Sequence, residues 1–213
     1  PYLLYASEGL KKGRGTNEAA ARGTEMHAEL ETYVLSGRTD GNPDPIGKEF
    51  LDQLYDEGCE VQPEKRFTLD ANWQEVPEDR KSMTAILDVF ATDKFGGVLI
   101  GDYKTGRRYD LKHTQQAQLY AAVINQVYGI SECRARFIYL DGHDELAIDF
   151  NKRTMKMAVD FWKMQGELML TAHKAMFAPP DSLDGIPKYY HDLLRDPNSY
   201  DKEHFFPPWL ARG

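Results

Sequence analysis

The chain has few cysteines. Only Cys59 and Cys133 occur among its 213 residues, and they lie far apart in the sequence. Two thiols cannot supply the four thiolates of an iron–sulfur cluster or of an all-cysteine zinc site. They also cannot form the set of disulfides that stabilises many small secreted domains. The cysteine count therefore favours a reduced, intracellular protein.

Long hydrophobic runs are absent as well. No apolar stretch approaches the ~18–20 residues that a membrane-spanning helix needs. Residues 1–5 lack the basic segment and the complete apolar segment of a signal peptide. There is also no internal repeat and no low-complexity tract. We therefore expect a globular protein without a membrane partner.

Positive charge is scarce overall but concentrated locally. The formal net charge is −8, which argues against a protein that coats nucleic acid nonspecifically. Residues 94–139 nevertheless contain seven Lys and Arg residues against three acidic ones. A basic segment on an acidic chain fits a narrow track for a polyanion. The alternative is a solvated surface with a chance excess of cations.

Hydrophobic periodicity predicts one mixed α/β domain. Helical patterns cover residues 17–36, 44–57, 113–128 and 152–177. Strand patterns cover residues 59–69, 83–92, 97–103, 134–140 and 145–150. The last two strands surround an Asp-Gly turn and should form a hairpin. This order predicts a mixed central sheet flanked by helices, with a long C-terminal helix.

Two of the predicted strands carry isolated carboxylates. Asp88 lies in the apolar run 85–90, and Asp102 lies near the end of the run that precedes Lys104. Residues two apart in a strand share a face, so Asp102 and Lys104 project to the same side, roughly 6–7 Å apart at their Cα atoms. If the two strands pair as a hairpin, Asp88 can face them. Two carboxylates and an ammonium suit a divalent cation with an activated water, and hence phosphodiester hydrolysis.

His27 lies on the apolar face of the first predicted helix. It shares that face with Gly23, Leu30 and Val34, so its side chain should point inward. Gly23, one turn earlier, would allow a neighbouring element to approach closely. A histidine in this position is either a hydrogen-bonded core residue or a ligand of the site.

Gln116 and Tyr120 share the apolar face of the helix predicted over 113–128. They fall in its first turns, close to the end of the strand that carries Asp102. A buried amide and a buried phenol must find hydrogen-bond partners. These partners are either structural groups or the carboxylates of the site.

The polar residues occur in a characteristic order. The matching segments are Arg22-Gly23-Thr24-x-x-His27-x-x-Leu30-Glu31, Ile86-Leu87-Asp88, Gly101-Asp102-Tyr103-Lys104-Thr105-Gly106 and Gln116-x-x-x-Tyr120. In this combination, over roughly residues 20–140, the chain resembles the PD-(D/E)XK nuclease superfamily, and within it the RecB-like exonuclease branch. It departs from many relatives in having Ala85-Ile86 where they carry glycine. It also lacks the cysteines of the members that hold an iron–sulfur cluster.

The resemblance implies a metal centre. Asp88, Asp102 and the backbone carbonyl of Tyr103 would bind the cation, and His27 would help to hold a second one. Lys104 would orient or deprotonate the attacking water. The implied cofactor is one or two Mg²⁺ or Mn²⁺ ions, since hard cations prefer oxygen ligands and an imidazole favours Mn²⁺. No iron–sulfur cluster is expected.

The resemblance also implies DNA contacts. Gln116 and Tyr120 would shape the site and contact the DNA backbone. Arg22, Arg107 and Arg108 are further candidates for DNA binding. Glu64, on the first predicted strand, is either an additional carboxylate of the site or a solvated residue of an edge strand, and the sequence leaves this open.

The implied fold has a restriction-endonuclease-like core in the order αβββαβ. We expect residues 1–178 to form this nuclease domain. After Pro179-Pro180 the composition becomes aromatic, proline-rich and charged. Residues 179–213 are therefore expected to be a tail that packs on the domain or contacts DNA.

The function implied by the resemblance is that of a metal-dependent DNA exonuclease acting on DNA ends or single strands, in recombination, repair or phage DNA metabolism. The alternatives are a structure- or sequence-directed endonuclease on the same fold and a non-cleaving DNA-binding protein. Besides DNA, the expected partners are a recombinase, a single-strand-binding protein or a helicase. The expected location is the cytoplasm of a bacterial or phage-infected cell. The mitochondrial matrix is the second choice.

Overall fold

A computed structural model describes residues 18–142 and 144–177. Residue 17, the predicted start of the first helix, and the predicted tail, 179–213, lie outside these ranges. The helices are α2 (Glu18–Leu35), α3 (Pro45–Asp56), α4 (Asp110–Tyr128) and α5 (Lys152–Phe177), with a short 3₁₀ turn at Glu78–Arg80. The strands are β1 (Glu60–Leu69), β2 (Met83–Thr92), β3 (Val98–Lys104), β4 (Cys133–Tyr139) and β5 (Asp144–Phe150). No described helix is long and apolar enough to cross a membrane.

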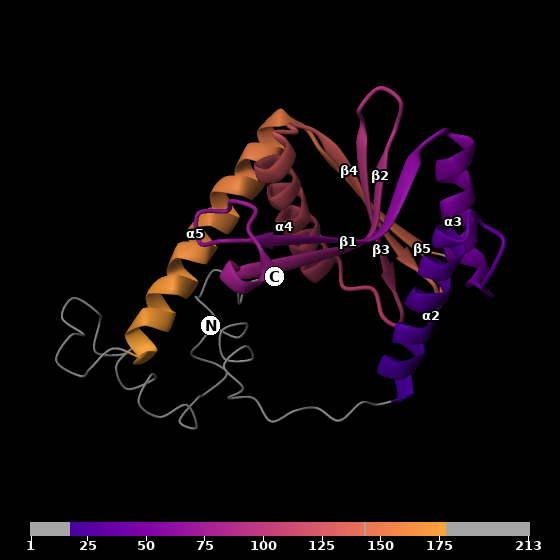
Figure 1. The fold of residues 1–213 in the computed structure, drawn as a ribbon, viewed down its shortest axis with the longest axis horizontal. Coiled ribbons are helices and arrows are strands. Elements are labelled where there is room, and N and C mark those ends of the chain that lie inside the picture. Colours follow the sequence, from indigo (N-terminus) through magenta and orange to yellow (C-terminus); the bar gives the residue numbers. More distant parts are fainter. Residues whose placement is uncertain (1–17, 143, 178–213) are drawn as a thin grey trace. The chain divides into compact units, whose positions relative to one another are not determined.

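The strands form one mixed sheet in the order β1-β2-β3-β4-β5 (Figure 1). Neighbouring strands are antiparallel except β3 and β4, which are parallel. A parallel pair needs a crossover connection, and α4 provides it. The expected fold, a mixed sheet flanked by helices with a long C-terminal helix, is confirmed. The predicted hairpins β2–β3 and β4–β5 are both present.

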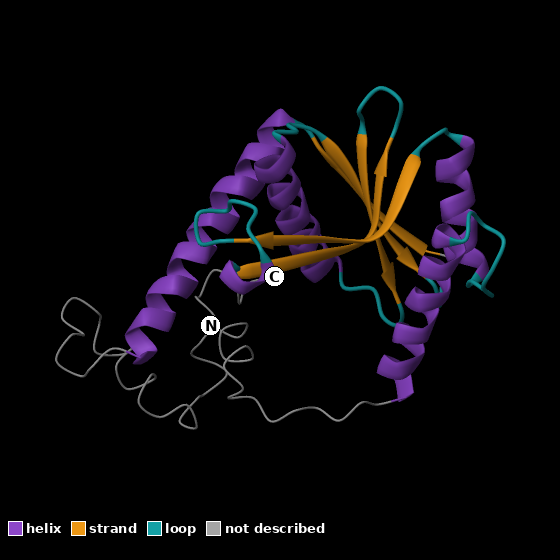
Figure 2. Ribbon diagram, in the orientation of Figure 1, coloured by secondary structure: helices purple, strands orange, loops and turns teal. Residues whose placement is uncertain are grey.

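Two apolar clusters cover the two faces of the sheet. The first, called here the α4 cluster, contains Phe67, Leu87, Ile100 and Phe137 with residues of α4 and the start of α5, including Met155. The second, called the α2–α3 cluster, contains Leu30 and Phe50 from those helices with Val89, Leu99 and Tyr103 from the sheet. Figure 2 shows helices on either side of the strands. Along β3, Ile100 and Leu99 therefore face opposite clusters, as the period of a strand requires.

In β1 and β2, the odd-numbered side chains switch from one face of the sheet to the other part-way along each strand. On β1, Val61 packs against the α2–α3 cluster, whereas Phe67 belongs to the α4 cluster. Both are odd-numbered and would share a face in a regular strand. On β2 the same change separates Leu87 from Val89. Figure 2 shows both strands bending near the middle of the sheet.

Most element boundaries lie within one residue of the sequence-based expectation, and the start of α4 differs by more. Helix α4 begins at Asp110, three residues before the predicted start at His113. Asp110 lies in the first turn, where an acidic residue is stabilised by the helix dipole. Strand β3 extends to Lys104 because its last residues continue the parallel pairing with β4. At the other end, α4 stops at Tyr128, the predicted last residue, and Gly129 terminates it in a left-handed conformation.

Gly101 is the point at which the sheet has no room for a side chain. A Cβ atom at this position would lie 2.9 Å from Phe50 Cε1 and 2.9 Å from Val89 Cβ, both in the buried α2–α3 cluster. We expect Gly101→Ala to lower the free energy of unfolding by about 1–3 kcal/mol through overpacking. Urea denaturation would measure this. Gly142→Ala is the control, since no atom lies within 4 Å of a Cβ there; equal stability of the two variants would contradict the prediction.

Candidate active site

Asp102 is the buried centre of the polar cluster. It lies near the end of β3, on the face covered by α4, and is only 3% exposed. Its Oδ1 accepts a hydrogen bond from Gln116 Nε2 at 2.9 Å and one from Tyr120 Oη at 3.3 Å. Gln116 Nε2 also lies 2.6 Å from the Tyr120 hydroxyl. The structure thus brings together three residues that the sequence placed on an inward-facing strand and helix.

Lys104 contacts the same carboxylate. Its Nζ forms an ion pair with Asp102 Oδ2, as expected for residues two apart on one face of a strand. The ammonium also lies 5.4 Å from the centre of the Phe137 ring, which is a cation–π distance. With 22% of its side chain exposed, Lys104 forms the solvent-facing side of the site while Asp102 forms its floor.

Asp88 and His27 form the other half of the site. Asp88 Oδ2 accepts the backbone N–H of Tyr103 at 2.7 Å, which attaches β2 to β3 beside Asp102. His27 Nδ1, from α2, lies 3.4 Å from the same oxygen. The hydrogen bond with Asp88 is the main cause of a raised His27 pKa, which burial partly opposes. The imidazole of His27, from α2, and the carboxylate of Asp88, from β2, are therefore in contact.

Tyr103 supports His27 from within the α2–α3 cluster. The two rings meet edge to face, with centroids 5.7 Å apart. The Tyr103 hydroxyl is buried without a hydrogen-bond partner among the described residues. Burial raises the pKa of Tyr103 well above its usual range. The side chain thus has a packing role, while the predicted role of its backbone carbonyl as a metal ligand stays a prediction.

Gly23 lets α2 approach the end of β3. A Cβ atom at Gly23 would lie 2.9 Å from Thr105 Oγ1, closer than real Cβ contacts. Thr105 directly follows Lys104, so the absent side chain brings the helix and the site strand together. The close approach predicted from the sequence is confirmed.

Glu64 joins the cluster from β1. The register pairs the residues on either side of Glu64 with those on either side of Asp88, so the two acids stand opposite each other. Ligand atoms of His27, Glu64 and Asp88 all lie within 4.8 Å of one another. Glu64 also has a left-handed backbone, with φ of 47°, although it lies within a strand. This conformation is costly for a residue other than glycine, and it occurs where β1 and β2 change faces.

The charges in the site are crowded. Burial, with the nearby Asp88 charge, raises the pKa of Asp102 to about 6, and Lys104 opposes this shift. Burial also raises the pKa of Glu64, with contributions from Asp88 and Glu31. Carboxylates held this close together favour a divalent cation as a counter-charge. The donor set of carboxylate oxygens and one imidazole fits Mg²⁺ and, better, Mn²⁺.

Arg22 is engaged in an ion pair. Its Nη2 donates to Asp141 Oδ1 at 2.6 Å, and Asp141 Oδ2 accepts the N–H of Gly106 at 2.7 Å. The arginine therefore connects α2, the β4–β5 turn and the loop after β3. This contact shows a structural role for Arg22; its predicted DNA contact stays a prediction.

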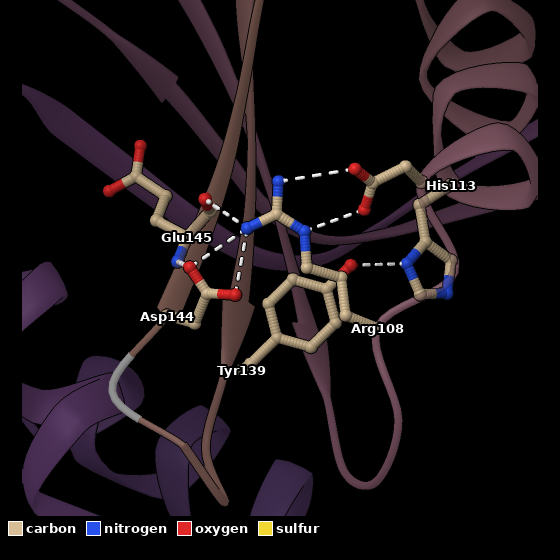
Figure 3. Close-up of polar contacts among 6 residues, drawn as sticks. Arg108, His113, Tyr139, Asp144 and Glu145 are labelled. Carbon is tan, nitrogen blue, oxygen red and sulfur yellow. Dashed lines mark hydrogen bonds and ion pairs between the residues drawn. The ribbon is translucent and has the colours of Figure 1, made fainter.

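Arg107 and Arg108 are both exposed, but Arg108 also binds three acceptors. Arg108 Nε lies 2.6 Å from Asp110, and Nη1 lies 2.7 Å from Asp144 and 3.3 Å from the carbonyl oxygen of Glu145 (Figure 3). These contacts fix the loop between β3 and α4 to the start of β5. The exposed Arg107 is thus the freer cation of the predicted pair for contacts to a polyanion.

Comparisons with known proteins give distant structural likenesses. No protein-family model and no curated protein matches the chain. The chain is similar to a solved structure of a candidate exonuclease from Eubacterium rectale, with a TM-score of 0.46 and 12% identity over 79% of this chain and 72% of that one. It is also similar to SSO0001, with a TM-score of 0.33 and 14% identity over 83% of this chain and 91% of that one. Likenesses this distant assign no function to the chain.

The His27–Asp88 contact predicts how His27 titrates. In protein treated with EDTA, NMR of the imidazole signals should give a His27 pKa above about 6.5, the value for an unperturbed histidine. Asp88→Asn should lower it, because the negative charge is lost while the acceptor for the Tyr103 N–H is retained. The contact stabilises the fold at low pH and stops doing so as the pH rises through the His27 pKa.

His113 provides an internal control in the same spectra. Burial lowers its pKa, and the largest charge contributions come from Lys104 and Lys112 rather than from Asp88. Its titration should therefore be the same in wild-type protein and in Asp88→Asn. A His27 pKa that Asp88→Asn leaves unchanged would show that the two side chains are not in contact in solution.

Proposed function

We propose that this protein is a divalent-metal-dependent deoxyribonuclease of the PD-(D/E)XK type that degrades DNA from ends or single strands. One observation carries the proposal: Asp88, Asp102, Lys104 and His27, from three separate elements, converge at one end of β3. A buried carboxylate beside a second carboxylate, an ammonium and an imidazole is costly for stability alone. It is the set of groups that metal-assisted phosphodiester hydrolysis requires.

The proposed cation ligands are Asp88 and Asp102, the Tyr103 carbonyl, His27 and Glu64. A bound cation would lower the pKa of a coordinated water and neutralise charge on the scissile phosphate. Gln116 and Tyr120 fix the orientation of Asp102 through their hydrogen bonds to its Oδ1. Oδ2, which pairs with Lys104, would be the oxygen that binds the cation.

Lys104 is the group that we propose acts on the attacking water. Both of its contacts, the Asp102 carboxylate and the face of Phe137, attract an ammonium. The arrangement therefore supports a role in orienting water and in stabilising negative charge on the phosphate. Pairing with Asp102 also holds the flexible lysine side chain in place before substrate arrives, which reduces the entropy lost in the reaction.

The test is a cleavage assay with end-labelled linear single-stranded, linear duplex and closed circular DNA, each with Mg²⁺, Mn²⁺ or EDTA. We expect linear DNA to be degraded only with a metal and circles to be spared. Lys104→Ala should lower kcat by about 10²–10⁴-fold, and Asp102→Asn should abolish cleavage. Both variants should keep the wild-type circular dichroism spectrum.

Charge-matched variants on the far strand and helix serve as controls. Asp149→Asn and Lys152→Ala remove the same charges as Asp102→Asn and Lys104→Ala, but from exposed residues of β5 and α5. Both control variants should cleave DNA at the wild-type rate. Cut circles would identify an endonuclease on the same fold. Full activity of Asp102→Asn would refute the site, and DNA binding without cleavage under any metal would indicate a non-cleaving DNA-binding protein.

Glu64 gives a prediction that does not depend on catalysis. If its carboxylate is a cation ligand, Glu64→Gln should weaken Mn²⁺ binding, measured by isothermal titration calorimetry, by about 10–100-fold. Glu31→Gln is the matched control. It removes the same charge from the surroundings of Glu64, but Glu31 does not belong to the cluster of His27, Glu64 and Asp88. Equal effects of the two substitutions would mean that Glu64 contributes only charge.

A further inference from the structure

Tyr109 occupies a position that helix stability does not explain. It is the N-cap residue of α4, and its side chain makes no capping hydrogen bond. Ser, Thr, Asp and Asn are preferred at this position because their side chains accept an N–H of the first turn. The Tyr109 ring is instead 55% exposed. A large aromatic side chain is thus exposed to solvent at a position where a small polar residue would stabilise the helix better.

The residues around Tyr109 extend this exposed surface. Leu111, in the first turn of α4, is 75% exposed. Arg107 and Lys112 flank the pair and are exposed cations. Single exposed apolar residues are common, but here an aromatic ring, an aliphatic side chain and two cations occur within six consecutive residues. We call Arg107, Tyr109 and Leu111 the platform.

The platform is held in place from both sides. Arg108 is bound to Asp110 and Asp144, and its guanidinium also lies 5.9 Å from the centre of the Tyr139 ring (Figure 3). The backbone carbonyl of Tyr109 accepts the N–H of His113 at 2.9 Å. An exposed loop that is fixed by this many contacts loses little entropy when it binds a ligand.

A continuous series of ring contacts connects the platform to the site. The Lys104 ammonium lies 5.4 Å from the centre of Phe137, which stacks on His113 with centroids 5.4 Å apart. The His113 ring in turn lies 6.2 Å from that of Tyr109, edge to face. His113 is fixed by a hydrogen bond of 2.5 Å between its Nδ1 and Tyr139 Oη (Figure 3). The platform is therefore only a few side chains from the proposed site of hydrolysis.

We propose that the platform binds an unpaired nucleobase of a single-stranded DNA end, with the base stacked on Tyr109 and the adjacent phosphate near Arg107. This inference rests on the proposed function and specifies its substrate as single-stranded. An aromatic face with a neighbouring cation is the chemistry by which single strands are bound irrespective of sequence. The bases of a duplex are already stacked on one another and offer no free face.

The experiment measures binding of a fluorescein-labelled oligothymidine and of a blunt hairpin duplex by fluorescence anisotropy, in EDTA so that no cleavage occurs. Tyr109→Ser should weaken single-strand binding by roughly 5–100-fold, the loss expected from one stacked base. Duplex binding should be unchanged. Tyr109→Phe keeps the ring and should bind like wild type. Leu111→Ala should have a smaller effect in the same direction.

Phe95→Ser is the matched control, because Phe95 is an 87% exposed aromatic residue beside a lysine, in the β2–β3 turn. It should leave binding unchanged. The melting temperature separates binding from folding: Tyr109→Ser introduces a good cap and should unfold at the wild-type temperature or higher.

Several outcomes would overturn the inference. The first is a Tyr109→Ser variant that binds single strands as tightly as the wild-type protein and Phe95→Ser do. The second is a Tyr109→Ser variant that loses stability in parallel with binding. An equal loss on the duplex would remove the single-strand preference. If the wild-type protein cleaves DNA while the platform variants behave normally, only this inference fails. If the wild-type protein neither binds nor cleaves DNA, the proposed function fails with it.

Discussion

The burial of the Asp102 carboxylate is the constraint on which the rest of the site depends. A carboxylate in an apolar interior is costly unless its oxygens have partners. The partners come from the same strand, through Lys104, and from α4, through Gln116 and Tyr120. Helix α4 can supply them because it is the crossover between the parallel strands β3 and β4. The parallel pairing thus brings α4 over Asp102, and α4 supplies the hydrogen bonds that make the buried charge tolerable.

The sequence predicts those parts of the fold and site whose determinants are local. A two-residue period places Asp102 and Lys104 on one face, and the structure confirms this. A helical period places His27 inward and Gly23 at a close approach, and both are found. The strand pair that carries Asp88 and Asp102 follows from two apolar runs and a short turn, so the hairpin is also predictable.

Other features depend on tertiary structure and escape prediction. Pro63 in β1 indicates an irregular edge strand, but no sequence pattern shows that Glu64 adopts a left-handed backbone or that it stands opposite Asp88. The arginines are a second case. A guanidinium binds carboxylate and phosphate equally well, so only the folded chain reveals that Arg22 and Arg108 contact Asp141 and Asp144.

Loop-closure entropy indicates the order in which the parts of the site should form during folding. Asp88 and Asp102 belong to consecutive strands joined by a short turn, and such a hairpin closes quickly. The contacts of Asp102 with α4 and of Asp88 with His27 close longer segments of chain and carry a larger entropic cost. A chain in which only the hairpin has formed holds two carboxylates without the groups that orient them. We therefore expect the folding chain to bring the two carboxylates together before the groups that orient them are in place.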